Sequence, residues 1–311
     1  MNTNVTGLHH ITAIASDPKR NLDFYTKILG LRFIKRSVNQ DEPGTYHLYY
    51  GDYAATPGTI LTFFPYSGLP RGRPGTGQAY ATAFSVPFGS LAYWRERLTG
   101  LGVPFGSTEL RFKDEILPFN DPDGLHLELV ATGENDLRPP ASSAGVPAQF
   151  ALRGFHSSSL ALKDDRPTAE LLVQGMGYLL VGRSGHRARY TVGAGGPGTY
   201  VDLLTEPALP RGINGAGTVH HIAFRIANDA NQEAARAALH DRGLDVSPVI
   251  DRAYFKSIYY REPGGVLFEI ATDGPGFAVD EPVESFGSKL SLPPRLEPRR
   301  GEIEAALPPL G

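Results

Sequence analysis

Short runs of alternating apolar and polar residues fill this chain, and a helical pattern interrupts them at regular intervals. The first strand-like run is Leu8–Ala15. Asp17-Pro18 then supplies an N-cap and a first-turn proline for a helix that ends at Gly30. The apolar positions of this helix recur at helical spacing: Leu22, Tyr25, Ile28 and Leu29. Three further strand-like runs follow: Leu31–Val38, Thr45–Gly51 and Thr59–Phe64. The pattern predicts one βαβββ unit.

The same order of patterns recurs three more times. Helices of the later units are predicted at Ser90–Thr99, Arg166–Gln174 and Ala230–Asp241. The segments that close the second and fourth units, Asp121–Val130 and Glu262–Ala271, correspond closely. Because an internal repeat decides the fold, we predict an α+β fold. Its four repeated βαβββ units form two curved, mostly antiparallel sheet barrels with helices outside.

Stretches rich in Pro, Gly, Ser and Ala divide the chain, most clearly at Thr132–Ala148. We expect an N-terminal domain at 1–135 with units one and two, and a C-terminal domain at 150–273 with units three and four. Residues 274–311 would form an irregular tail with one short helix at Arg300–Ala306.

Composition and charge narrow the classes of function. The 311 residues carry a formal net charge of −3, which favours neither nucleic acid nor an anionic membrane as a partner. Cysteine is absent, so disulfides and thiolate metal sites are excluded and a metal must use His, Asp, Glu or Tyr. No stretch approaches the roughly 18 apolar residues of a membrane span, and no signal peptide begins at Met1. We expect a cytoplasmic protein, and a homo-oligomer is compatible with the sequence.

Two His-His pairs, His9-His10 and His220-His221, open equivalent strands of the first and fourth units. Because side chains alternate along a strand, a curved sheet of such units would bring His10, His221 and Glu269 to one place. A lone buried histidine is more often a hydrogen-bonded core residue, but an ionised Glu269 buried without a partner costs several kcal/mol. A metal would compensate that cost. Two histidines and one carboxylate form a facial triad that leaves positions open for oxygen and substrate.

The repeat counterpart of Glu269 is Glu128. The strand that opens unit two has no histidine, and the strand that opens unit three offers only His156. We therefore interpret Glu128, His126 and His156 as remnants of a second site or as structural polar groups, and we expect one metal per chain.

The four units and the His-His-Ile-Thr start resemble the vicinal oxygen chelate superfamily, which includes glyoxalases, extradiol dioxygenases and bleomycin-resistance proteins. Within it, the likeness is strongest to ring-cleaving dioxygenases acting on hydroquinones, and it covers about 7–272. The resemblance implies a non-haem Fe(II)-dependent dioxygenase of extradiol type, which inserts both atoms of O2 into a hydroquinone or related dihydroxy-aromatic substrate. Mn(II) would suit the same ligands nearly as well. The metal ligands would be His10, His221 and Glu269. Further catalytic roles are implied for five residues: Tyr259, Arg252, His220, His9 and Thr12.

Strand alternation agrees unevenly with these roles. Thr12 shares the face of His10, whereas His9 and His220 should point the other way and could instead be hydrogen-bonded behind the sheet. The turn at 262–265 folds its strand back on the strand of Glu269, which places Tyr259 within about one residue of being opposite that ligand. Arg252 could neutralise a phenolate, or it could be a solvated loop charge.

Two other functions remain open. A glyoxalase-like lyase or isomerase usually has a fourth protein ligand, and the equivalent segment Leu61–Phe64 has no carboxylate. A metal-free protein that binds an aromatic compound would be distinguished by its metal content.

Overall fold

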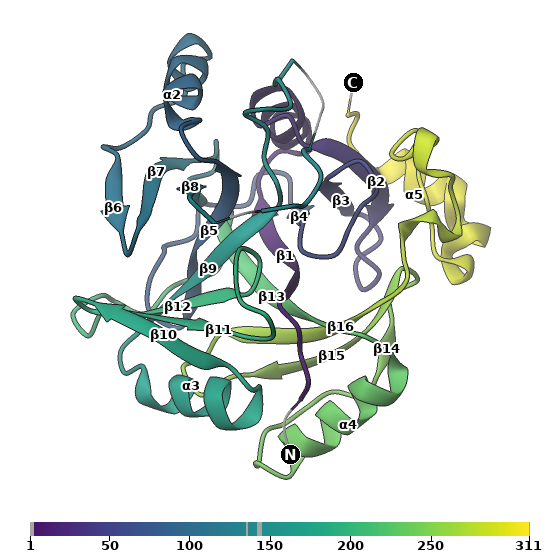
Figure 1. Ribbon diagram of the computed structural model, residues 1–311. Coiled ribbons are helices and arrows are strands. Elements are labelled where there is room, and N and C mark those ends of the chain that lie inside the picture. Colours follow the sequence, from purple (N-terminus) through teal and green to yellow (C-terminus); the bar gives the residue numbers. More distant parts are fainter. Residues whose placement is uncertain (1–2, 135, 142–144, 311) are drawn as a thin grey trace.

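The computed structural model describes residues 3–134, 136–141 and 145–310. Along these ranges four βαβββ units follow one another (Figure 1). Unit one comprises β1 (Leu8–Ala15), α1 (Pro18–Asp23), the π-helical turn η1 (Phe24–Ile28), β2 (Arg32–Val38), β3 (Tyr46–Gly51) and β4 (Ile60–Pro65). Unit two comprises β5 (Gln78–Pro87), α2 (Leu91–Gly100), β6 (Glu109–Arg111), β7 (Asp114–Asn120) and β8 (His126–Thr132).

The second half of the chain repeats this order. Unit three comprises β9 (Phe155–Leu162), α3 (Arg166–Glu170), the π-helical turn η2 (Leu171–Gly175), β10 (Leu179–Ser184), β11 (Arg187–Thr191) and β12 (Tyr200–Thr205). Unit four comprises β13 (Thr218–Ile226), α4 (Asp229–His240), β14 (Ile250–Asp251), β15 (Phe255–Arg261) and β16 (Leu267–Pro275).

The units associate across the chain rather than in sequence order. One eight-stranded sheet has the order β14-β15-β16-β13-β1-β4-β3-β2 and therefore joins unit four to unit one. The other has the order β10-β11-β12-β9-β5-β8-β7-β6 and joins unit three to unit two. The pairs β1–β4, β13–β16, β5–β8 and β9–β12 are parallel, and the other neighbouring strands are antiparallel. The prediction of two mostly antiparallel sheets made from repeated units is confirmed.

Each sheet takes four strands from each half of the chain. The predicted domain boundaries at 135 and 150 divide the sequence into these halves, and they stay a prediction. Some residues at the ends of the predicted domains lie outside the described residues, namely 1, 2, 135 and 311. Residues 142–144 of the predicted linker also lie outside them.

Three neighbouring strands of the first sheet bring the two His-His segments and Glu269 together. β1 and β13 are antiparallel, with Thr12 opposite His221 and His10 opposite Ala223. β16 lies parallel to β13 on its other side and sets Glu269 opposite the same Ala223. The alternate positions of these strands, including Ile11, Ile222 and Phe268, are fully buried in the main apolar core. The packing of that core fixes which face the ligand side chains take.

The chain after β16 packs against the edge of the first sheet, where it lies beside β2 and β3 in Figure 1. It contains the short helices η3 (Phe277–Val279), η4 (Val283–Ser285), η5 (Pro294–Arg299) and α5 (Arg300–Ala306), and α5 confirms the predicted terminal helix. The fully buried ammonium of Lys35 on β2 holds this tail through Asp280 at 2.7 Å and Glu281 at 2.8 Å. None of the helices in the described ranges has the length and hydrophobicity that a membrane span requires.

Candidate metal centre

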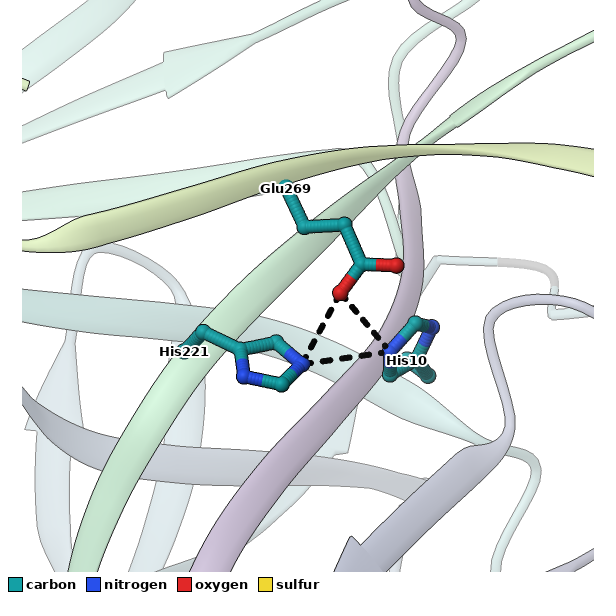
Figure 2. A group of neighbouring side chains, drawn as sticks. All are labelled: His10, His221 and Glu269. Atoms are coloured by element: carbon teal, nitrogen blue, oxygen red, sulfur yellow. Dashed lines mark hydrogen bonds and ion pairs between the residues drawn. The ribbon is translucent and has the colours of Figure 1, made fainter. Parts of the chain in front are cut away.

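Glu269, His10 and His221 point toward one another from β16, β1 and β13 (Figure 2). Oε2 of Glu269 lies 2.9 Å from Nε2 of His221 and 3.3 Å from Nε2 of His10. The two Nε2 atoms are 3.4 Å apart. All three side chains are buried, and theirs is the one group among the described residues in which three such ligand atoms lie within 4.8 Å of one another.

The electrostatics of this group suit a metal ion. Burial on its own raises the pKa of Glu269, but the imidazoles of His10 and His221 outweigh it and hold the pKa well below its usual value. Burial lowers the pKa of His221, although the charge of Glu269 opposes this shift. Oε1 of Glu269 accepts a hydrogen bond from Ser257, whereas the fully buried Oε2 has no hydrogen-bond donor. A buried carboxylate oxygen without a donor, beside two imidazole nitrogens, is a donor set that a divalent cation satisfies.

His10 and His221 are each supported by the histidine that precedes them in the chain. Nδ1 of His10 lies 2.9 Å from Nδ1 of His9, and Nδ1 of His221 lies 2.7 Å from Nδ1 of His220. Burial, with a smaller effect of the neighbouring imidazole, lowers the pKa of His9 well below its usual value and that of His220 to about 3. A neutral imidazole can accept a hydrogen bond, so Nδ1 of each supporting histidine can accept one from Nδ1–H of its neighbour. This holds the neighbour in the tautomer that leaves Nε2 free for a metal.

A cavity of about 260 Å³ opens beside the ligands and is lined in part by Tyr259 and Arg252. Tyr259 on β15 is directly opposite Glu269 on β16, as the turn at 262–265 predicted. Nε of Arg252 donates a hydrogen bond to the Tyr259 hydroxyl at 3.1 Å. Burial, reinforced by the charge of Glu269, raises the pKa of Tyr259. Burial lowers the pKa of Arg252, but Tyr259 and Glu269 reverse that effect and raise it overall. At neutral pH the pair is a phenol that keeps its proton and a charged guanidinium.

The remaining predicted residues differ in their access to the cavity. His220 lines it together with His221. His9 lines a second cavity. Phe255 lines both cavities, and its ring centroid lies 4.8 Å from that of His10. Thr12 is fully buried, and its hydroxyl is hydrogen-bonded to Thr62 at 2.8 Å. Strand alternation correctly indicated that His9 lies away from the cavity, but it was wrong for His220. The register shift between β1 and β13 at Thr12 and Ala13 leaves His220 as an extra residue, so the simple alternation fails there.

Reasoning from sequence missed the cavity wall formed by unit one. This wall comprises Asn39, Gln40, Asp41, His47, Tyr49, Phe64 and Tyr66. His47 and Tyr49 are two residues apart on β3, so their shared face was visible in the sequence. Nothing in the sequence linked β3 to the strands of His10, His221 and Glu269, because β4 lies between β3 and β1 in the sheet.

The equivalent place in the second sheet holds ion pairs instead of a ligand group. Both carboxylate oxygens of Glu128 accept hydrogen bonds from Arg111, at 2.8 and 2.9 Å. Asp114 binds Arg189 at 2.9 Å and lies 3.5 Å from His156. Arginine cations therefore neutralise these acids, which agrees with the interpretation of Glu128 and His156 as structural polar groups. His126 packs edge-on against Tyr80, at 4.6 Å between ring centroids.

Comparison with known proteins gives the family. The model of the Glyoxalase/Bleomycin resistance protein/Dioxygenase superfamily matches residues 7–129 and 164–270. MhqO of Bacillus subtilis (strain 168), by name a candidate ring-cleaving dioxygenase, is 45% identical over 97% of this chain and 96% of its own. The chlorohydroquinone/hydroquinone 1,2-dioxygenase of Sphingobium indicum is 35% identical over 96% of this chain and 95% of its own.

Solved structures agree with this assignment. The crystal structure of a candidate dioxygenase from Bacillus subtilis subsp. subtilis str. 168 superposes with a TM-score of 0.94 at 45% identity, over 99% of this chain and 98% of that one. Glyoxalase I from Zea mays, at 14% identity, shares the fold with a TM-score of 0.64 over 86% of this chain and 92% of its own. The resemblance noted in the repeats and the His-His motifs is confirmed, and the chain belongs to the Glyoxalase/Bleomycin resistance protein/Dioxygenase superfamily.

Proposed function

We propose that this protein is a non-haem Fe(II)-dependent ring-cleaving dioxygenase of extradiol type, which inserts both atoms of O2 into a hydroquinone or a related dihydroxy-aromatic substrate. The observation that carries the proposal is the His10–His221–Glu269 group at the wall of a cavity lined by aromatic side chains. The names of the relatives support the same class of reaction.

The three residues would hold the metal through Nε2 of His10, Nε2 of His221 and the carboxylate of Glu269. This donor set carries one negative charge, and its three ligands would leave further positions of the ion for substrate and O2. Bound Fe(II) would supply the electronic coupling between a phenolate and O2, and Mn(II) could occupy the same ligands. His9, His220 and Ser257 would orient the ligand side chains through the hydrogen bonds described above.

Arg252 and Tyr259 would act on the substrate oxygen that faces the metal. The guanidinium favours the ionised form of a phenol, and the Tyr259 hydroxyl can donate a hydrogen bond to that oxygen or exchange a proton with it. His220 lies at the same cavity and can assist this exchange. Thr12 would hold the strand of His10 in place through the hydrogen bond between its hydroxyl and that of Thr62.

The size of the cavity suits a small substrate. A cavity of roughly 150 Å³ accommodates benzene in another protein, so about 260 Å³ has room for one substituted ring and a small molecule such as O2. We therefore propose single-ring diphenols as the substrate class.

Oxygen uptake by Fe(II)-loaded protein, measured across matched hydroquinones and catechols, tests the proposal. The expected result is oxygen consumption with hydroquinones and, under ¹⁸O2, two labelled oxygen atoms in a ring-opened product. Turnover of a hemithioacetal without oxygen would instead indicate a glyoxalase-like enzyme. Tight binding of aromatics by protein that retains no metal would indicate a binding protein.

A further inference from the structure

A chain of hydrogen bonds extends along the unit-one wall of the cavity. The Tyr49 hydroxyl lies 2.6 Å from Nδ1 of His47, and Nε2 of His47 lies 2.9 Å from the Thr62 hydroxyl. Thr62 is in turn hydrogen-bonded to Thr12, at 2.8 Å. The chain therefore connects β3 through β4 to β1, and its cavity end is formed by Tyr49 and His47.

The direction of these hydrogen bonds follows from the ionisation states. Burial raises the pKa of Tyr49 well above its usual value and lowers that of His47 well below it, so the phenol keeps its proton and the imidazole is neutral. A neutral imidazole has one donor and one acceptor. Because a phenol is the better donor, we assign Tyr49 as the donor to Nδ1 of His47, and Nε2–H of His47 then donates to Thr62. No other hydrogen bond to the Tyr49 oxygen is made within the described ranges, so its lone pairs are available on the cavity side.

Packing holds this acceptor in place. The His47 ring packs against the rings of Tyr49 and Phe64, at centroid distances of 4.0 and 4.3 Å. The Tyr49 ring contacts Phe277 of the C-terminal tail at 5.3 Å. An acceptor fixed in advance loses little conformational entropy when a ligand binds.

We propose that the Tyr49 oxygen, positioned by His47, receives the hydroxyl group of the bound ring that lies away from the metal, and that this subsite selects para-dihydroxy aromatics. The inference rests on the proposed function and names its substrate class. In a catechol the two oxygens are adjacent and both reach one metal ion. In a hydroquinone the second hydroxyl is at the opposite end of the ring, where only the protein can receive it. Tyr259 on β15 and Arg252 just before it contact the oxygen at the metal. Tyr49 on β3 contacts the oxygen at the opposite end of the ring.

Calorimetric titration of Fe(II)-loaded protein without oxygen tests this subsite, with hydroquinone and 4-methylphenol as the matched pair of ligands. The two differ at the far position, where 4-methylphenol has no hydroxyl to donate. We expect Tyr49→Phe to weaken hydroquinone binding about tenfold, the typical effect of one neutral hydrogen bond, and to leave 4-methylphenol binding unchanged. Tyr50→Phe is the matched control, because Tyr50 faces the other side of β3 and donates to Asn21 at 2.8 Å; it should change neither affinity.

Two variants of His47 test the positioning role. His47→Leu removes the acceptor that orients the Tyr49 hydroxyl and should reproduce the selective loss of hydroquinone affinity, whereas His47→Gln retains an acceptor and should restore most of it. Equal losses for both ligands, or no loss in Tyr49→Phe, would overturn the inference. Because binding is measured without oxygen, a protein that shows the selective loss but consumes no oxygen would refute the proposed function and leave the subsite standing. Failure of the wild type to bind hydroquinone would refute both.

Discussion

Replacement of Glu269 by glutamine tests the metal site through the stability of the fold. The side chain is fully buried, and its Oε2 atom has no hydrogen-bond donor. Glutamine has nearly the same shape but no charge, so Glu269→Gln removes an ionised group whose burial is costly without a cation. The variant also loses the interaction with the imidazoles of His10 and His221, which holds the pKa of Glu269 well below its usual value. The metal-free variant should therefore be less stable than the metal-free wild type, because the fold favours the ionised form of Glu269.

The magnitude of the metal effect follows from binding linkage. Metal at 100 times its dissociation constant stabilises a folded protein by about 2.7 kcal/mol. For a chain of 311 residues, each kcal/mol raises Tm by roughly 1.5 °C. The wild type should accordingly gain about 4 °C when Fe(II) or Mn(II) is added without oxygen. Glu269→Gln should gain less than about 2 °C, because the remaining imidazole ligands are neutral and hold the ion weakly.

Thermal unfolding of both proteins with and without metal is the assay, and Glu128→Gln is the matched control. Glu128 occupies the equivalent position of the second unit, and its carboxylate is bound by Arg111. This control should lose about 1–3 kcal/mol of stability and keep the full response to metal. A normal metal response in Glu269→Gln would exclude its carboxylate as a ligand, and a wild type with no response would refute the triad.

Three other predictions follow from buried groups. Tyr259→Phe should lower hydroquinone turnover about 100-fold with the metal retained, as oxygen uptake and metal analysis would show, because the hydroxyl at the reacting oxygen is lost. Lys35→Met should lower the free energy of unfolding in denaturant by about 3–5 kcal/mol, because the carboxylates of Asp280 and Glu281 lose their buried cation. Burial, with nearby arginines, holds the pKa of His156 well below 6.5, so the unfolded chain takes up the extra proton and stability decreases as the pH falls below about 6.5. His156→Gln should reduce that slope by at most about 1.4 kcal/mol per pH unit, measured by denaturant unfolding between about pH 6 and 5.

Controls and contrary outcomes differ among these three. Tyr260 lies on the opposite face of β15 against Met176, so Tyr260→Phe should keep full turnover, and equal kinetics for both tyrosine variants would exclude a role for Tyr259. Lys289 lies on the surface of the tail, so Lys289→Met should change the free energy of unfolding by less than about 0.5 kcal/mol. If Lys35→Met changed it as little as Lys289→Met does, the buried ion pairs of Lys35 would contribute nothing to stability. An unchanged slope in His156→Gln would show that this imidazole titrates alike in the folded and unfolded chains.

Local pattern was enough to predict a large part of this protein. Strand alternation and the repeat placed His10, His221 and Glu269 on corresponding faces of their strands, and the turn at 262–265 placed Tyr259 opposite Glu269, as the structure has it. These features depend on the period of side chains along a strand and on hairpin geometry, which a few neighbouring residues determine. The same repeat predicted that Glu128 would stand apart from the metal site, since its unit lacks the histidines.

Long-range packing decided the rest. The association of unit one with unit four put β3 into the wall of the cavity, so His47 and Tyr49 became candidate substrate contacts that no motif could reveal. Arg111 on β6 meets Glu128 on β8 across the intervening strand β7. Which strands become neighbours in a sheet depends on burial of the whole apolar core and on the twist of the sheet, not on the residues of any one strand. The sequence by itself therefore determined which three side chains form the candidate metal site and which way they face, and the tertiary structure alone decided what surrounds the space in front of them.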